Sequence, residues 1–193
     1  MDIRPDYAEA HFNVGNLFQE LGKLDDATNS YRRALAIKPD FVEAHNNLGA
    51  TLQGVGKPED AVASYQKALD LKPDYAEAHN NLGVALHDLG KLEDAAASCQ
   101  KALDLKPDYA EAHYNLGNAL KEMGELDDAM ASYQKALGLK PDYAEAHYNL
   151  GGVLGRQGNV DEAAKQIDLA LSYEAEKDSW RINKALLLPP IPY

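Results

Sequence analysis

The heptapeptide Pro-Asp-Tyr-Ala-Glu-Ala-His begins at Pro5, Pro73, Pro107 and Pro141, and the variant Pro-Asp-Phe-Val-Glu-Ala-His begins at Pro39. The five copies are 34 residues apart. Two series of glycines keep the same spacing: Gly15, Gly49, Gly83, Gly117 and Gly151, and Gly22, Gly56, Gly90, Gly124 and Gly158. A fixed period of this length indicates a repeat architecture, in which each unit is stabilised by its neighbours.

The period divides the 193 residues into five repeats and two short ends. Residues 1–7 are interpreted as the end of a preceding repeat. Residues 178–193 are interpreted as a capping helix, starting near Trp180, followed by a proline-rich tail. The five repeats are residues 8–41, 42–75, 76–109, 110–143 and 144–177.

Each repeat reads as two helices joined by a turn, and the fourth repeat shows the pattern. Asp108 and Glu111 have the spacing of a capping box, which predicts the start of a helix. An apolar-periodic helix follows over residues 112–123, and Gly124 fits the left-handed position after its end. A second helix runs to the stop at Pro141.

This pattern resembles the tetratricopeptide repeat (TPR) family, which has 34 residues per repeat. The matching residues in the fourth repeat are Leu116, Gly117, Leu120, Ala129, Tyr133, Ala136 and Pro141. The resemblance implies an all-α fold, an α-solenoid that forms a right-handed superhelix of five helix-turn-helix units with a C-terminal capping helix. At His113, and at His11, His45, His79 and His147, the family usually has Trp.

Helical geometry at ~100° per residue assigns the faces of the first helix of each repeat. In the fourth repeat, Ala112, Leu116, Ala119 and Met123 form one buried stripe, and His113, Gly117 and Leu120 form a second. The recurrence of Gly117 in every repeat suggests a close approach of helices, because glycine destabilises a helix interior by about 1 kcal/mol. The TPR resemblance implies that the remaining face lines a concave, ligand-binding groove.

One asparagine recurs on that face in every repeat, and its neighbours vary. An Asn side chain offers a donor and an acceptor, as pairing with a peptide backbone requires. The hypothesis is a ladder of asparagines that holds an extended peptide, similar to the ladder in the TPR segment of O-linked N-acetylglucosamine transferases. The alternative is that each Asn bonds only to the neighbouring repeat or to water. The candidate peptide-binding residues are Asn13, Asn47, Asn81, Asn115, Asn149, Asn46, Asn80, Tyr114, Asn118 and Tyr148.

Composition limits the partners. The chain has 31 acidic against 19 basic residues, a formal charge of −12. This balance argues against nucleic acid and against anionic membrane surfaces, because both require clustered Lys and Arg. No stretch approaches the ~20 apolar residues of a membrane span. We expect a cytoplasmic protein whose ligand is a neutral or basic peptide or protein segment.

No motif for catalysis, phosphate binding or metal binding appears, so we expect no enzyme activity, no cofactor and no metal site. Equivalent His residues on helices ~8–10 Å apart cannot share one ion, and packing is the favoured interpretation. Cys99 takes the place of a core Tyr and is interpreted as a buried, unreactive residue. The acidic row that includes Glu111 is interpreted as a set of capping boxes.

Three functions remain open on the sequence alone. The first is a non-catalytic scaffold that binds an extended peptide in its groove. The second is the substrate-recruiting TPR segment of a larger enzyme, such as an O-linked N-acetylglucosamine transferase-like glycosyltransferase. The third is a module that self-assembles through the ends of the array or its C-terminal tail.

Overall fold

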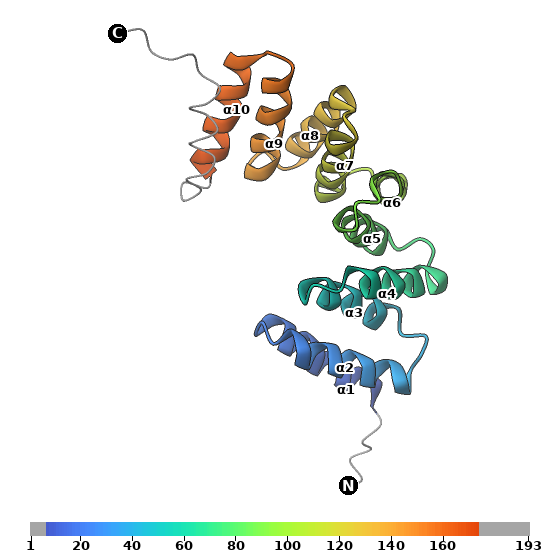
Figure 1. Cartoon of the computed structure of the whole chain (residues 1–193). Helices are drawn as coiled ribbons and strands as arrows, with labels where there is room; N and C mark the ends of the chain where they lie inside the picture. The colour runs from blue at the N-terminus through green and yellow to red at the C-terminus, as the bar shows by residue number, and fades with distance from the viewer. Residues whose placement is uncertain (1–6, 174–193) are drawn as a thin grey trace. The chain divides into compact units, whose positions relative to one another are not determined.

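The structure is a computed structural model that describes residues 7–173, which form ten α-helices and no strand (Figure 1). In chain order these are α1 (Ala8–Glu20), α2 (Leu24–Ile37), α3 (Val42–Gly54), α4 (Pro58–Leu71), α5 (Ala76–Asp88), α6 (Leu92–Leu105), α7 (Ala110–Met123), α8 (Leu126–Leu139), α9 (Ala144–Arg156) and α10 (Val160–Tyr173). The all-α class is confirmed. The predicted capping helix and tail, residues 178–193, lie outside the described residues, and so does the predicted end of a preceding repeat apart from Tyr7.

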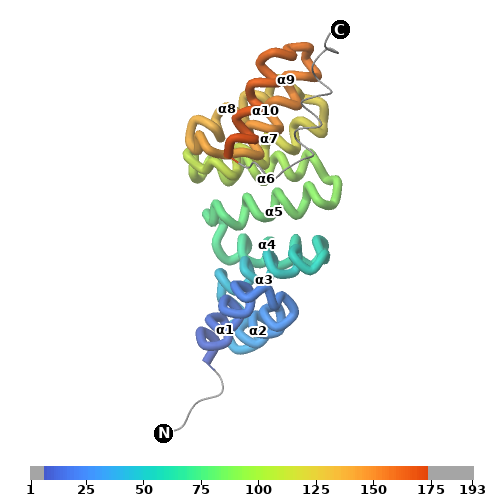
Figure 2. The backbone as a smooth tube through the Cα atoms, turned by 90° about the vertical axis from the view of Figure 1, so that its left-hand side faces the viewer, coloured from blue at the N-terminus to red at the C-terminus, as the bar shows by residue number. Residues whose placement is uncertain are grey.

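The chain divides into two compact units, one ending at Leu105 and one beginning at Lys106. In the first unit, each of α1 to α5 packs on the next helix, and the first helices of successive pairs, α1, α3 and α5, also contact each other. The second unit repeats this arrangement with α7 to α10, and α7 contacts α9. Figure 2 traces the succession of pairs within each unit. Both units therefore have the solenoid architecture that the period predicts.

The core consists of small residues packed against tyrosines. Tyr31, Tyr65 and Tyr133 are the largest fully buried side chains. A Cβ added at Gly117 would lie 2.7 Å from Cε1 of Tyr133, so the predicted close approach is confirmed. The buried alanines around these tyrosines let the helices meet closely, and they occupy two positions of every second helix: Ala27, Ala61, Ala95, Ala129 and Ala163, and Ala34, Ala68, Ala102, Ala136 and Ala170.

The predicted stripes of the first helix match the burial in α7. Ala112, Ala119 and Gly117 are buried, and His113 is buried as well. Leu116, Leu120 and Met123 are half-buried, and Leu120 packs against the core cluster that contains Ala129 and Tyr133.

The turn between pairs corrects the capping-box prediction. Tyr109 N donates to Lys106 O over 3.2 Å, so Pro107 and Asp108 are the central residues of a β-turn, where proline is favoured. The N-cap of α7 is therefore Tyr109, and no side chain caps it. Asp108 is held one residue too early to reach the first free N–H groups of the helix.

A histidine and a lysine hold this turn. His113 Nε2 lies 2.9 Å from the Pro107 carbonyl oxygen, and His45, His79 and His147 make the same contact with Pro39, Pro73 and Pro141. A carbonyl oxygen only accepts, so Nε2 donates in each case. Lys106 Nζ lies 4.8 Å from the centroid of the Tyr109 ring, a cation–π distance. The histidine that replaces the family's usual Trp thus binds the turn that precedes its own helix.

The turn within each pair is set by glycine. Gly124 follows α7 with φ 86°, and the other four glycines of its series also have positive φ. This conformation is inexpensive only for glycine, as the sequence predicts. Among the residues that the structure describes, no helix is both long and apolar enough to cross a membrane.

Candidate functional site

The ladder asparagines, Asn13, Asn47, Asn81, Asn115 and Asn149, lie on the first helices of the five pairs. In the first unit, Asn47 Nδ2 donates to Asn16 Oδ1 over 3.0 Å. Asn81 Nδ2 donates to Asn46 Oδ1 over 3.2 Å. Each of these bonds joins a first helix to the first helix of the preceding pair. The preceding pair therefore fixes the orientation of both amides.

In the second unit the equivalent amide makes more bonds. Asn149 Nδ2 donates to Asn118 Oδ1 over 3.0 Å and to the Tyr114 hydroxyl over 3.1 Å. Its Oδ1 accepts from Lys121 Nζ over 3.2 Å. Asn149 therefore lies at the centre of a network that ties α9 to α7.

The core tyrosines reach the same networks, which the sequence did not reveal. Tyr133 donates its hydroxyl to Asn118 Oδ1 over 2.8 Å, and Tyr31 donates to Asn16 Oδ1 over 2.7 Å. Burial raises the pKa of both phenols, so they remain donors throughout the physiological range. One feature of the sequence could have predicted these bonds. They form in the pairs that have both a Tyr equivalent to Tyr133 and an Asn equivalent to Asn118. The other pairs have Tyr65 with Ala50, Cys99 with Val84, and Ile167 with Gly152.

The variable neighbours of the ladder lie deeper than the helical wheel indicates. Asn46 and Asn80 are 2% and 5% exposed. At the same position, Tyr114 packs against Tyr143 with ring centroids 4.8 Å apart, and Tyr148 packs beside Ala144 and Ala170. This position lies at the junction between pairs. Asn46 supports the ladder at this position, because its Oδ1 accepts from Asn81 Nδ2.

The comparisons with known proteins agree with this architecture. A family model described as TPR repeat matches residues 15–56 and 117–158, and models described as tetratricopeptide repeat match residues 47–110, 98–131 and 144–177. The solved structure of MamA protein is 31% identical, with 96% of this chain and 98% of that chain covered and a TM-score of 0.75. The chain belongs to the tetratricopeptide repeat family.

Two further TPR structures resemble the chain over most of its length. TTC0263, a thermophilic TPR protein in Thermus thermophilus, is 27% identical over 94% of this chain and 98% of that chain, with a TM-score of 0.75. YrrB, a TPR protein with an unusual peptide-binding site, is 23% identical over 94% of both chains, with a TM-score of 0.73, and supports the fold alone. No curated protein sequence matched this TPR chain.

Charge differs between the two units at the C-terminal ends of their first helices. The first unit of this TPR array has Glu20 on α1 and Asp88 on α5. At the same position the second unit has Glu122 on α7 and Arg156 on α9, with Lys121 beside them. Burial lowers the pKa of Lys121, while Glu122 opposes that shift and Arg156 adds to it.

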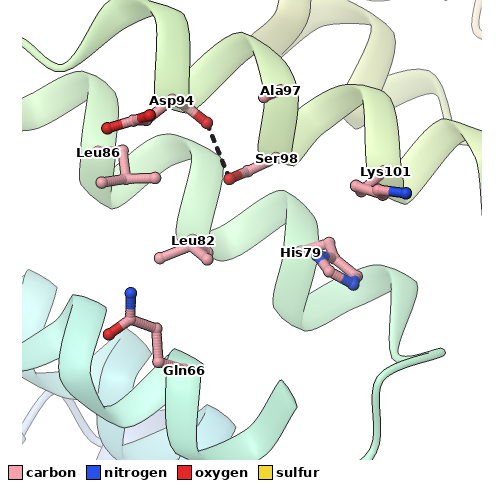
Figure 3. Close-up of a pocket in the computed structure, with 8 residues that line it drawn as sticks. All are labelled: Gln66, His79, Leu82, Leu86, Asp94, Ala97, Ser98 and Lys101. Atoms are coloured by element: carbon pink, nitrogen blue, oxygen red, sulfur yellow. Dashed lines mark hydrogen bonds between the residues drawn. The ribbon is translucent and has the colours of Figure 1, made fainter. Parts of the chain in front are cut away.

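A shallow cleft lies away from the ladder, in the first TPR unit. Figure 3 shows this cleft of about 390 Å³, with Gln66 of α4 on one side, Leu82 and Leu86 of α5 as its floor, and Asp94 and Lys101 of α6 on the other. His79 and Ser98 also line it, but His79 Nε2 already donates to the Pro73 carbonyl and Ser98 Oγ to the Asp94 carbonyl. The cleft is shallow and has few free polar groups that converge on one point.

The described residues contain no group of three His, Cys, Asp or Glu side chains placed to hold a metal ion. Cys99 is buried, and burial raises the pKa of its thiol to about 12. A neutral thiol is a poor nucleophile and a poor metal ligand. The ladder and its surrounding polar network are therefore the candidate site of this TPR chain.

Proposed function

We propose that the chain is a non-catalytic scaffold that binds an extended peptide or protein segment along the faces of its first helices, through the ladder asparagines. The observation that carries this proposal is the pair of bonds that fix Asn47 and Asn81 from behind. Each Nδ2 carries two hydrogens, and the bond to the preceding pair uses one of them. The amide is thereby oriented before a ligand arrives, which reduces the entropy lost on binding.

The spacing of the ladder suits an extended chain. Packed helices lie about 8–10 Å apart. An extended peptide advances about 3.3 Å per residue, so successive asparagines would meet every third residue of a ligand. Backbone groups recur at that interval in any sequence, so the ladder supplies affinity, and neighbouring side chains supply selectivity.

The proposed contacts divide into two groups. Asn13, Asn47, Asn81 and Asn115 present amides to the ligand. Asn149, Asn118, Tyr114 and Tyr148 form the wall of the groove in the second unit, and Asn46 and Asn80 act as supports below the surface. A segment that recruits substrates for a larger enzyme would use these same contacts, so that alternative shares the binding mode.

A pair of matched substitutions tests the ladder. Asn81→Ala removes both the amide at the groove and its bond to Asn46, whereas Asn46→Ala removes the same bond from behind and leaves the Asn81 amide in place. We expect Asn81→Ala, combined with Asn47→Ala, to weaken binding to an array of neutral extended peptides about ten-fold or more, at one to two lost hydrogen bonds. Asn46→Ala should lower thermal stability and weaken binding by a smaller factor, because it removes the orientation of the Asn81 amide but not the amide itself. Equal losses of affinity in both variants would contradict the ladder.

Self-assembly is a second candidate, and the outer face of α1 favours it. Leu17 and Leu21 are 55% and 60% exposed, and Val14 joins them at helical spacing. In α9 the residues equivalent to Val14 and Leu17, Leu150 and Val153, are buried against α8. An uncovered apolar stripe of this kind marks an interaction surface.

The variant Leu17→Asn with Leu21→Asn tests this second candidate. If copies associate through α1, light scattering across a range of concentrations should show association of the parent chain and a monomer for the variant. Leu139→Asn, at a leucine that is also exposed, is the matched control and should leave association unchanged. A parent chain that stays monomeric at all concentrations would exclude this candidate.

A further inference from the structure

The ladder asparagine of α9 has no N–H left for a ligand. Both hydrogens of Asn149 Nδ2 are used, one by Asn118 Oδ1 and one by the Tyr114 hydroxyl. An Asn side chain has only these two donors. At this point of the groove, the amide donor that characterises the ladder is committed to the protein itself.

A lysine that contacts Asn149 has further donors. Lys121 Nζ is bound to Asn149 Oδ1, and an ammonium group carries three hydrogens, so two remain for a ligand. Lys121 is half-buried, and its charge has lost part of its hydration. Arg156, at the end of α9, is exposed and close enough for its charge to act on Lys121. Glu122 lies beside them and offsets one of the two positive charges.

The first unit has no cation at the equivalent positions. Residues equivalent to Lys121 are Gln19, Gln53 and His87, and those equivalent to Arg156 include Glu20 and Asp88. The Asn ladder of the first unit is therefore bordered by two glutamines, a histidine and acidic residues. The cationic position belongs to α7 and α9 alone among the described first helices.

We propose that the groove of the second unit binds an acidic side chain of the peptide, Asp or Glu, through Lys121 Nζ, with Arg156 as a supporting charge. This inference rests on the proposed function and names the ligand chemistry at one point of the same groove. A carboxylate would restore the interactions that a half-buried ammonium has lost from water, and a hydrogen bond between opposite charges is stronger than a neutral one. It replaces the expectation of a neutral or basic ligand for this stretch.

Fluorescence anisotropy with labelled 12-residue peptides tests the proposal on the full chain. The parent peptide is neutral and built from Ala, Ser and Thr, and a single Asp is placed at each position in turn, with Asn at the same position as the uncharged control. We expect one register at which Asp binds about ten-fold more tightly than Asn. All peptides carry an amidated C-terminus, and one set with a free C-terminal carboxylate distinguishes a side-chain carboxylate from a chain end.

The variants separate this inference from the proposed function. Lys121→Met should abolish the preference for Asp, Arg156→Met should reduce it, and Lys121→Arg should keep it. Lys135→Met, on the second helix α8, is the matched control and should change nothing. If neutral peptides bind and depend on Asn47 and Asn81, but no register prefers Asp, the acidic-ligand inference is wrong and the scaffold proposal stands. If no peptide binds, or if only a free C-terminal carboxylate is preferred, the inference is also overturned.

Discussion

The helical pairs α7–α8 and α5–α6 solve the same packing problem with different residues. In α7–α8, Gly117 lies against the ring of Tyr133, and the Tyr133 hydroxyl reaches Asn118. In α5–α6, Gly83 lies against the sulfur of Cys99, and Val84 stands in place of the asparagine. Both pairs are closely packed at the glycine. Only in α7–α8 does the core side chain donate a hydrogen bond to a residue of the polar network, Asn118. The polar network of the groove is therefore anchored in the core at some pairs and not at others.

The largest expected effect concerns the reactivity of Cys99. Burial raises the pKa of its thiol from about 9 to about 12, so at pH 8 the thiolate is about a thousand-fold scarcer than in the unfolded chain. We expect alkylation by iodoacetamide to be slower by about that factor in the folded protein, measured by mass spectrometry. The exposed variant Gln100→Cys in a Cys99→Ser background is the control, and equal rates would contradict a buried thiol.

The raised pKa of the Cys99 thiol also makes the stability of the protein depend on pH. The unfolded thiol ionises above about pH 9, while the folded thiol stays protonated up to about pH 12. The contribution of Cys99 to stability is therefore complete below pH 9 and decreases as the pH rises between these values. A comparison of the parent chain with Cys99→Ala over this range should isolate that contribution.

Converting the tyrosine pair into a cysteine pair should be the most damaging substitution. Tyr133→Cys leaves a cavity and removes the bond to Asn118, and we expect the free energy of unfolding to fall by about 3–5 kcal/mol. Urea unfolding followed by circular dichroism measures the loss. Cys99→Ala, which removes one sulfur atom from the cysteine pair, should cost only about 1 kcal/mol. Equal losses would mean that the two cores are equivalent.

Gly117→Ala tests the close approach of the ring. The new methyl group would lie 2.7 Å from Tyr133 Cε1, so the ring or the helix must shift. We expect a loss of about 2 kcal/mol from overpacking, part of which the better helix propensity of Ala offsets. Gly138→Ala, where no atom lies within 4 Å of the added carbon, should instead raise the stability by about 0.5–1 kcal/mol in the same urea titration.

Asn118→Val copies the third repeat into the fourth and should have a smaller effect than Gly117→Ala. It removes the acceptor for the Tyr133 hydroxyl and for Asn149 Nδ2, and we expect a loss of about 1 kcal/mol. Adding Tyr133→Phe should recover part of this loss, because the unpaired hydroxyl disappears with it. A further loss in the double variant would show that the hydroxyl has another partner.

The features that the sequence predicts well depend on neighbours close in the chain. The period places the helices, Gly124 has the positive φ that its place after a helix requires, and Gly117 meets its tyrosine within one pair. These contacts depend on helix geometry and on one short turn. Helical periodicity is sufficient to derive them.

The features that it misses depend on helix packing and on turn geometry, which a helical wheel does not describe. Asn46 and Asn80 lie on the open side of a helical wheel, but the junction between pairs buries them. Asp108 has the spacing of a cap, but the β-turn at Pro107 shifts the N-cap to Tyr109. The bonds from the tyrosine hydroxyls to Asn16 and Asn118 likewise depend on how the two helices of a pair pack together. A helical wheel shows in which direction a side chain points from its own helix, but not which neighbouring helix covers that side chain.

The bonds of the ladder also bear on how fast the chain folds. The side-chain hydrogen bonds that join Asn47, Asn81 and Asn149 to the preceding pair span between 28 and 35 residues. No loop longer than about one repeat has to close before such a bond can form, so the contact order stays low however many repeats are joined. Folding can begin at any pair and spread to the next, at a rate that depends little on the length of the array.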